Sequence, residues 1–237
     1  EDQIFNWTYV DEQREKEPWD ATADGPNPYI DLPGIQIFSY DIGGDAEKWA
    51  ADGEFDGFSL NEYFKAKKLN PRSNSTAVGS YEFEDADRVY EFLEMLRGTL
   101  PEQMKLQIVG GQKPPFPYQA PVFAQAITHS VWYLNDVAAC FAMRDALLKH
   151  PYFKTFEIVV AAGSGVGMGA AAKPPVMDAI DRAAKAGTGS ITLTCGKLMT
   201  GVTVREWGAI LMLRSLKSPE TYFQAAFRVQ SPWSKRL

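Results

Sequence analysis

The second half of this sequence predicts an α/β fold in which helices cover both faces of a parallel sheet. Two observations lead to this fold class. Short apolar segments rich in β-branched and aromatic residues alternate with segments of helical periodicity between residues 126 and 230. The strand-like segments are apolar almost throughout, which is typical of strands buried on both faces of a parallel sheet. We therefore expect one α/β domain at residues 126–237.

A strand and a helix open this domain. Residues 128–134 form a short apolar run with β-branched and aromatic members, which predicts a strand. Asn135 or Asp136 can cap the next helix, in which apolar residues recur at helical spacing. Pro151 ends that helix because proline cannot continue it.

The remaining elements alternate in the same way. Residues 156–162 predict a second strand, and the glycine-rich residues 163–169 follow it. Pro174 and Pro175 suit the first turn of a helix that Gly187 closes. Two more strands and a final helix complete the domain: strands at residues 191–194 and 209–213, and a helix that Ser218 caps, with Pro219 at its first position.

The first 125 residues predict an acidic and mainly helical accessory segment. Its expected elements are helices at residues 1–19, 60–68 and 86–97 and a strand at residues 35–40. Residues 70–80 are polar and loop-like. Four prolines between residues 110 and 121 prevent regular structure and predict a linker into the second half.

Charge divides the chain at the same place. Residues 126–237 contain 13 Lys and Arg against 7 Asp and Glu, a net charge of +6. Residues 1–125 contain 11 Lys and Arg against 23 Asp and Glu, a net charge of −12. A basic second half favours polyanion binding by that half alone. Charge scattered over solvated faces is the alternative that composition leaves open.

Composition also restricts the class of protein. The 45% hydrophobic content is ample for a core, and no run approaches the roughly 20 apolar residues of a membrane span. The start of the chain lacks both Met and a signal peptide, so we expect a cytoplasmic piece of a longer protein. Cys140 and Cys195 suit reduced core thiols, although a single disulfide stays open. Neither His129 nor His150 has a partner at metal-ligand spacing, so we expect no metal site.

The last predicted helix places Gln224 and Arg228 four residues apart, hence on one helix face. Residues 217–233 resemble motif VI of superfamily-2 helicases, in the branch of restriction-associated translocases, whose pattern is Gln-Arg-x-Gly-Arg-x-x-Arg. Three positions depart from that pattern, namely two arginines and the glycine, at Ala225, Ser231 and Phe227. In the family these arginines reach the γ-phosphate of ATP. The resemblance therefore implies catalytic roles for Gln224 and Arg228, the latter as an arginine finger.

Residues 197–205 resemble motif V of the same translocases, which reads Met-Leu-Thr-Thr-Gly-Val-Asp-Val-Pro. Gly201 would let backbone amides approach a phosphate. Thr203 and Arg205 stand where the family has its acid and its proline. The resemblance implies ATP-binding positions at Gly201, Thr203 and Arg228. Hydroxyl and basic side chains are further expected to contact a nucleic-acid backbone, at Thr194, Lys197, Thr200 and Arg214.

These likenesses, with a looser one at residues 3–17 and 27–33, imply the C-terminal RecA-like domain of a superfamily-2 DNA helicase or translocase. The family moves on DNA, in this branch on duplex DNA, as part of restriction or another phage-defence system. The chain lacks the phosphate loop and the DEAD/DEAH box. ATP and Mg would therefore be bound mainly by the N-terminal RecA-like domain of the same parent protein, beside nuclease or methylase modules. The chain alone should lack ATPase activity.

Two other functions stay open. The departures from motif VI leave room for a non-catalytic protein or nucleic-acid interaction domain on a motor fold. The glycine-rich residues 163–169 follow a strand, as a dinucleotide loop does, and leave room for an oxidoreductase. That loop lacks the strict Gly-x-Gly-x-x-Gly spacing, and no acid ends the next strand to hold a ribose.

Overall fold

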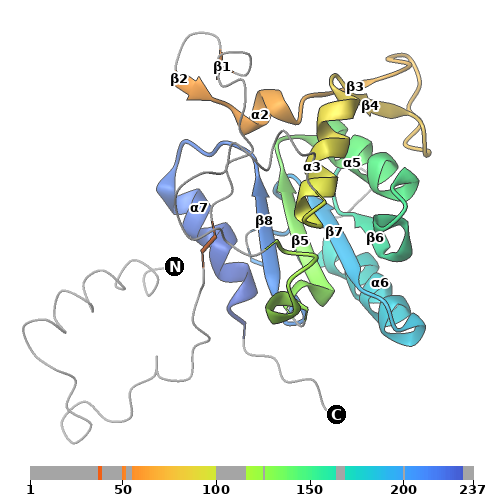
Figure 1. Cartoon of the computed structure of the whole chain (residues 1–237), viewed down its shortest axis with the longest axis vertical. Helices are drawn as coiled ribbons and strands as arrows, with labels where there is room; N and C mark the ends of the chain where they lie inside the picture. Colours follow the sequence, from red (N-terminus) through yellow and green to blue (C-terminus); the bar gives the residue numbers. More distant parts are fainter. Residues whose placement is uncertain are drawn as a thin grey trace, which may run out of the picture. The chain divides into compact units, whose positions relative to one another are not determined.

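A computed structural model describes residues 37–38, 50–51, 55–99, 116–124, 126–163, 169–199 and 201–231. All of these residues belong to one compact unit, Ile35–Leu237. A four-stranded parallel sheet of order β6-β7-β5-β8 lies at its centre, with helices on both faces (Figure 1). The predicted α/β fold class is confirmed, and it is consistent with the RecA-like fold that the resemblance implies.

The described elements of the second half follow the predicted order. The sheet contains β5 (His129–Leu134), β6 (Glu157–Val160), β7 (Ser190–Thr194) and β8 (Ala209–Leu213). The helices are α2 (Leu60–Tyr63), α3 (Ala86–Leu96), α5 (Val137–Lys149), α6 (Lys173–Ala186) and α7 (Pro219–Ala226). The first half contains α2, α3 and two antiparallel pairs, β1 (Ala50–Ala51) with β2 (Phe55–Phe58) and β3 (Ala66–Lys68) with β4 (Tyr81–Phe83). Short 3-10 turns are η2 (Pro121–Phe123), η3 (Ala126–Thr128), η4 (Phe153–Thr155), η5 (Gly169–Ala172) and η6 (Phe227–Val229).

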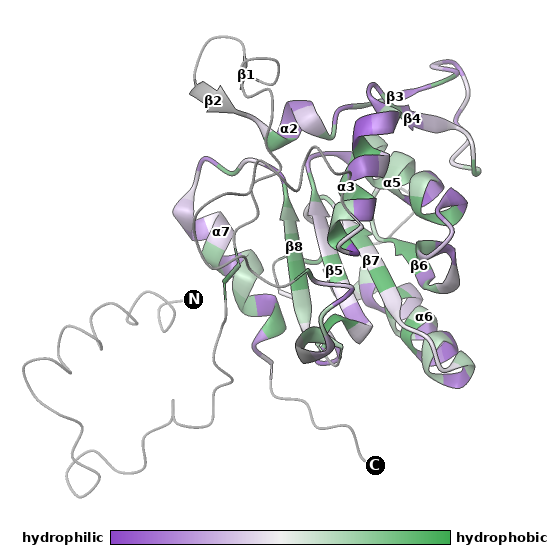
Figure 2. Ribbon diagram, viewed as in Figure 1, coloured by the Kyte–Doolittle hydropathy of each residue, from purple (hydrophilic) through white to green (hydrophobic). Residues whose placement is uncertain are grey.

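The central strand β5 separates two hydrophobic cores. Successive side chains of a strand point to opposite faces. Trp132 and Leu134 therefore lie in a first core with α3 and α5, whereas Val131 and Tyr133 lie in a second core with α6 and α7. The strands are mostly apolar and the helices carry apolar and polar residues side by side (Figure 2). Because helices cover both faces, the strand ends are the expected place for a ligand of such a sheet.

The helix ends form as the sequence predicts. The Asp136 side chain caps α5 by accepting a hydrogen bond from the Ala139 amide at 2.8 Å. Ser218 caps α7 by accepting one from the Thr221 amide at 3.3 Å. Gly187 ends α6 in the left-handed conformation, at φ +66°. These three predicted boundary residues are confirmed.

Residues 60–98 contribute directly to the first core. Phe64, Phe92 and Leu93 are buried there against the sheet and α5. Each such large apolar side chain contributes about 1.5–3 kcal/mol by leaving water. The polar loop predicted at residues 70–80 lies over α5, where Asp145 accepts a hydrogen bond from the Gly79 amide at 2.8 Å. The predicted helix at residues 86–97 is confirmed as α3.

His150 joins α3 to the end of α5. Its side chain is completely buried, and its Nε2 lies 2.8 Å from Oε1 of Glu94 in α3. Its Nδ1 accepts a hydrogen bond from the Tyr152 amide at 3.2 Å, which places the ring proton of the neutral form on Nε2. Burial lowers the pKa of His150, although Glu94 acts in the opposite direction.

Two predictions for the first half are wrong. The predicted helix at residues 60–68 is only one helical turn, α2, after which Ala66–Lys68 pair with Tyr81–Phe83 in an antiparallel hairpin. A longer helix would separate Lys67 from Glu82, whose side chains face each other across the hairpin at 3.1 Å. Ile37 and Phe38 lie outside any strand. The rest of the strand expected at residues 35–40 and the helix expected at residues 1–19 lie outside the described residues.

The proline-rich stretch packs into the fold where it is described. The hydroxyl of Tyr118 forms a hydrogen bond with Oγ of Ser130 at 3.1 Å and accepts another from Nε1 of Trp132 at 3.3 Å. Its ring meets Phe153 edge to face. Burial raises the pKa of Tyr118 well above its usual value, so this phenol stays protonated. Phe116 and Tyr118 therefore pack against the first core.

Candidate functional site

The carboxyl ends of the four parallel strands form the candidate site. Ligands of open α/β sheets bind outside these ends. The segments that follow the strands meet there: residues 135–136, 161–163, 195–197 and 214–215. We call these residues the carboxyl edge. Three of the residues predicted to contact nucleic acid belong to it or adjoin it: Thr194, Lys197 and Arg214.

Thr194 fastens β7 to the segment after β6. Its side chain is completely buried, and its hydroxyl donates a hydrogen bond to the carbonyl of Ala161 at 3.1 Å. The same oxygen accepts one from the Gly196 amide at 3.4 Å. A contact between Thr194 and a nucleic-acid backbone would require this hydroxyl to leave its carbonyl partner.

Lys197 crosses the carboxyl edge. Its ammonium group donates a short hydrogen bond to the carbonyl of Gly163, at the start of the glycine-rich segment. The side chain is half-buried. Lys197 thus joins the turn after β7 to the end of β6. Residues 164–168, on which the dinucleotide alternative depends, and Thr200 lie outside the described residues.

Arg214 stands at the end of β8 with its guanidinium over the ring of Tyr133, 4.8 Å from the centroid. Its Nη1 donates to the carbonyl of Cys195 at 3.4 Å. Its Nε is buried and has no hydrogen-bond partner among the described residues. The charge of Arg214 therefore stays at the carboxyl edge, held by an aromatic ring and one carbonyl.

Residues 201–205 alternate between solvent and core. Val202 and Val204 are buried in the second core, whereas Gly201, Thr203 and Arg205 are exposed. Gly201 has φ +65°, and a Cβ there would meet nothing within 4 Å. Backbone conformation, and not crowding, therefore favours glycine at this position. The predicted ATP-binding positions Gly201 and Thr203 both lie on the open side of this segment.

Arg228 connects the two motif segments. Its Nη1 donates to the carbonyl of Val202 at 3.0 Å, and its Nε donates to the carbonyl of Gln224 at 3.1 Å. Burial lowers the pKa of Arg228 from its ordinary value. Gln224 itself donates from Nε2 to Oε1 of Glu220, one turn earlier in α7, at 3.0 Å. The segments that resemble motifs V and VI therefore touch through Arg228.

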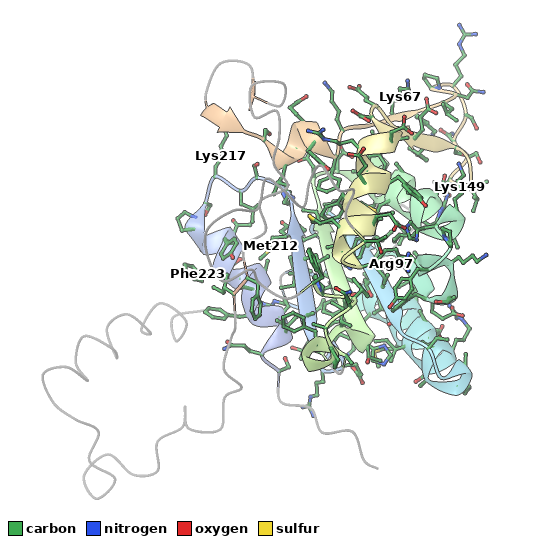
Figure 3. The ribbon with its side chains drawn as sticks, viewed as in Figure 1. Lys67, Arg97, Lys149, Met212, Lys217 and Phe223 are labelled. Atoms are coloured by element: carbon green, nitrogen blue, oxygen red, sulfur yellow. The ribbon has the colours of Figure 1, made fainter. Side chains whose placement is uncertain are left out.

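The departures from motif VI have a structural reason. Ala225, which stands where the motif has an arginine, is completely buried in the second core. Phe227, in the place of the glycine, stacks on Phe223 with ring centroids 6.0 Å apart. Figure 3 shows Phe223 at the outer side of α7 and Lys217 on the connection that precedes it. In this chain a buried alanine therefore stands where the motif has an arginine, and a stacked phenylalanine stands where the motif has its glycine.

Two features of the carboxyl edge were not predicted. Asn61 of α2 accepts a hydrogen bond from the Ser215 amide at 3.0 Å, and the Leu60 amide donates to Oγ of Ser215 at 3.0 Å. Cys140 and Cys195 pack in the same core, and the carbonyl of Cys195 accepts the hydrogen bond of Arg214. No sequence pattern connects Asn61 with Ser215. The placement of the two cysteines depends on β5 and β7 being neighbours in the sheet, which no local sequence pattern contains.

A separate depression of about 600 Å³ lies at the opposite, amino ends of β5 and β7. Its walls include aromatic and acidic side chains, among them Tyr152, Phe156, Asp181 and Glu206. None of the predicted site residues line it. Within the described part of the chain, no group of three or more His, Cys, Asp or Glu could hold a metal ion. Nor does any helix of that part have the length and apolarity to cross a membrane.

The fold and the edge geometry define a parallel α/β protein with basic side chains at the carboxyl ends of its strands. Comparison with known proteins adds one relative. The chain is 27% identical over 248 residues to a Mycoplasma pneumoniae protein whose name describes the C-terminus of a "putative type II restriction enzyme and methyltransferase". The match covers 99% of this chain and 32% of that protein, so the chain spans about a third of the length of its relative. No family model and no solved structure matches.

Proposed function

We propose that this chain is the second motor domain of an ATP-dependent DNA translocase of a restriction–modification system. The hydrogen bond from Arg228 to the Val202 carbonyl carries the proposal, because it joins the two segments that resemble motifs V and VI. The similarity to a protein named as a restriction enzyme and methyltransferase supports the restriction–modification part. The parallel sheet with helices on both faces supports the motor part.

The hydrogen bonds of Arg228 support a role toward phosphate. Two of its three guanidinium nitrogens, Nε and Nη1, donate to carbonyls of its own chain. This arrangement fixes the plane of the guanidinium and leaves Nη2 for a phosphate oxygen of a nucleotide held by the first motor domain. ATP and Mg²⁺ would be bound mainly by that other domain. Arg228 would stabilise the negative charge that develops during phosphoryl transfer.

The side chains of the carboxyl edge support a role toward DNA. Lys197 and Arg214 place two positive charges beside the ends of β7 and β8. Thr203 and Gly201 lie on the exposed side of the adjoining segment. Basic side chains, hydroxyls and backbone amides are the groups that contact a phosphate backbone without reading sequence. Such contacts suit a motor that moves along duplex DNA.

The decisive test is DNA-stimulated ATP hydrolysis by the full-length protein with Arg228→Ala. We expect a loss on the order of 10³-fold, as for other arginine fingers, with partial activity in Arg228→Lys. The matched control is Arg72→Ala, which removes an exposed arginine from the loop at residues 70–80. A thermal melt of each variant separates a catalytic loss from unfolding.

A non-catalytic interaction domain is the second candidate. One observation favours it: Ala225 is buried, so that a position which carries a charge in the motif only fills the core here. In that case Arg228 only fastens α7 to residues 201–205, and Arg228→Ala would leave ATP hydrolysis unchanged while lowering the melting temperature. The same experiment therefore decides between the two candidates.

A further inference from the structure

Both cysteines of the chain pack in the first core although they are 55 positions apart in sequence. Cys140 sits in the first turn of α5 and is completely buried in the first core. Cys195 directly follows β7, is partly exposed, and packs against the same core. The parallel pairing of β5 with β7 brings them together, because Tyr133 lies opposite Thr194 and both strands then leave the sheet at the same edge. Both thiols are free in this structure.

The surroundings make the two thiols unequal. A hydrogen bond from Cys140 is the main reason that the pKa of Cys195 falls to about 7, and the positive charge of Arg214 lowers it further. Burial and the carboxylate of Asp136 act in the opposite direction. The pKa of Cys140 is raised, first by the same hydrogen bond and then by burial. Cys195 is thus the partly exposed nucleophile, and Cys140 is the protonated neighbour behind it.

We propose that Cys195 is a site of peroxide oxidation and that Cys140 resolves it into a disulfide that alters the carboxyl edge. The Cys195 thiolate attacks one peroxide oxygen, the O–O bond breaks, and hydroxide leaves as Cys195 becomes a sulfenic acid. The sulfur of Cys140 then attacks the Cys195 sulfur, an S–S bond forms, and the S–O bond breaks. The oxygen leaves as water with the proton of Cys140, so two electrons pass from the two sulfurs to one peroxide.

The disulfide would act on the two basic side chains that are proposed to contact DNA. A disulfide requires defined distances and angles between its two residues, so its formation draws Cys195 toward α5. The carbonyl of Cys195 accepts the hydrogen bond of Arg214, and Lys197 lies two residues further on. Oxidation would therefore displace the two positive charges of the carboxyl edge. This second step rests on the proposed function, whereas the formation of the disulfide does not.

The first experiment maps the chemistry in the full-length protein. After hydrogen peroxide treatment, non-reducing peptide mass spectrometry should find a peptide that links Cys140 to Cys195, and dithiothreitol should remove it. Cys140→Ala should instead accumulate a sulfenic acid at Cys195 that dimedone labels. Cys195→Ser should leave Cys140 reduced. Thermal melts of both variants show whether they are folded. If they are, unlinked thiols in the wild type at the peroxide dose that labels Cys140→Ala would overturn the proposal.

The second experiment measures binding of the full-length protein to a labelled duplex before and after oxidation. We expect oxidation to weaken binding about tenfold, the effect of removing one charge-assisted hydrogen bond. Dithiothreitol should restore binding, and Cys195→Ser should be insensitive to peroxide. Equal affinity of the linked and reduced protein would refute the effect on the carboxyl edge. Absence of duplex binding by the reduced protein would count against the proposed function, and the peptide map would still decide on the disulfide.

Discussion

His150 shows how one buried side chain couples stability to pH. Its folded-state pKa lies below the ordinary value of 6.5 because burial disfavours the charged ring. Below about pH 6.5 the unfolded chain therefore binds a proton that the folded chain does not, and stability falls as the pH decreases toward the folded-state pKa. We expect the melting temperature to be lower at about pH 5.5 than at about pH 7.5.

The control for this prediction is His150→Gln, which keeps a donor toward Glu94 and removes the titration. The variant should have a lower melting temperature at neutral pH. At pH values above the range in which carboxylates titrate, its melting temperature should change little with pH. Thermal unfolding followed by circular dichroism measures both quantities. An unchanged pH dependence in the variant would assign the effect to another group.

The burial of Ala225 explains why this chain departs from the helicase pattern at that position. Restoring the motif with Ala225→Arg would bury a charge without a partner in the second core, where Ala225 has no exposed surface. We expect a loss of about 3 kcal/mol or more in the free energy of unfolding. The matched change Ser231→Arg restores another motif arginine at a half-buried position and should cost less than about 1 kcal/mol. Chemical denaturation of both variants would show equal losses if burial were not the reason.

The turn between α6 and β7 contains two glycines that are required for different reasons. Gly187 has φ +66° and open space around it, so Gly187→Ala adds backbone strain only, about 1 kcal/mol. At Gly189 a Cβ would lie 2.5 Å from the carbonyl oxygen of Thr128, so Gly189→Ala forces the backbone to move and should cost more, about 1–3 kcal/mol. Denaturant titration should give the lowest free energy of unfolding for Gly189→Ala and a higher one for Gly187→Ala. Gly187→Asn should be the most stable of the three variants, because asparagine tolerates this conformation.

The sheet and the helices around it could be predicted from sequence because their signals are local. Apolar runs predicted the strands, and Asp136, Ser218 and Gly187 predicted helix ends through side-chain caps and a left-handed residue. The hairpin of β3 and β4 could not be predicted, because its pairing depends on residues separated by the loop at positions 70–80. Propensity favours a helix there, and tertiary packing overrides it.

The candidate site was predicted only as a set of residue types. Sequence indicated Arg228 and Lys197 through motif spacing, but their carbonyl partners Val202 and Gly163 come from other segments. Burial of Thr194 follows from its place in a strand covered on both faces, and the pattern of a hydroxyl near a turn did not reveal it. The meeting of Cys140 with Cys195 depends on strand order, which no local pattern contains.

The carboxyl edge should bind duplex DNA in a salt-dependent and sequence-independent way. Lys197→Ala or Arg214→Ala should weaken binding and reduce the slope of log affinity against log salt by about 0.9 for each phosphate that the variant no longer neutralises. Lys149→Ala, which removes an exposed charge at the far end of α5, is the control and should leave the slope unchanged. Equal slopes for all three variants would place DNA binding elsewhere on the protein.

The first core contains residues from both halves of the chain, which matters for the choice of fragments to express. A fragment that begins at residue 126 would look complete by its motifs, yet it would leave α5 without the aromatic and aliphatic cover that Phe64, Phe92 and Leu93 provide. An apolar surface of that kind, open to water, promotes aggregation during expression. Recombinant fragments should therefore begin before residue 55, and failure of a shorter piece to bind DNA would not test the proposed motor function.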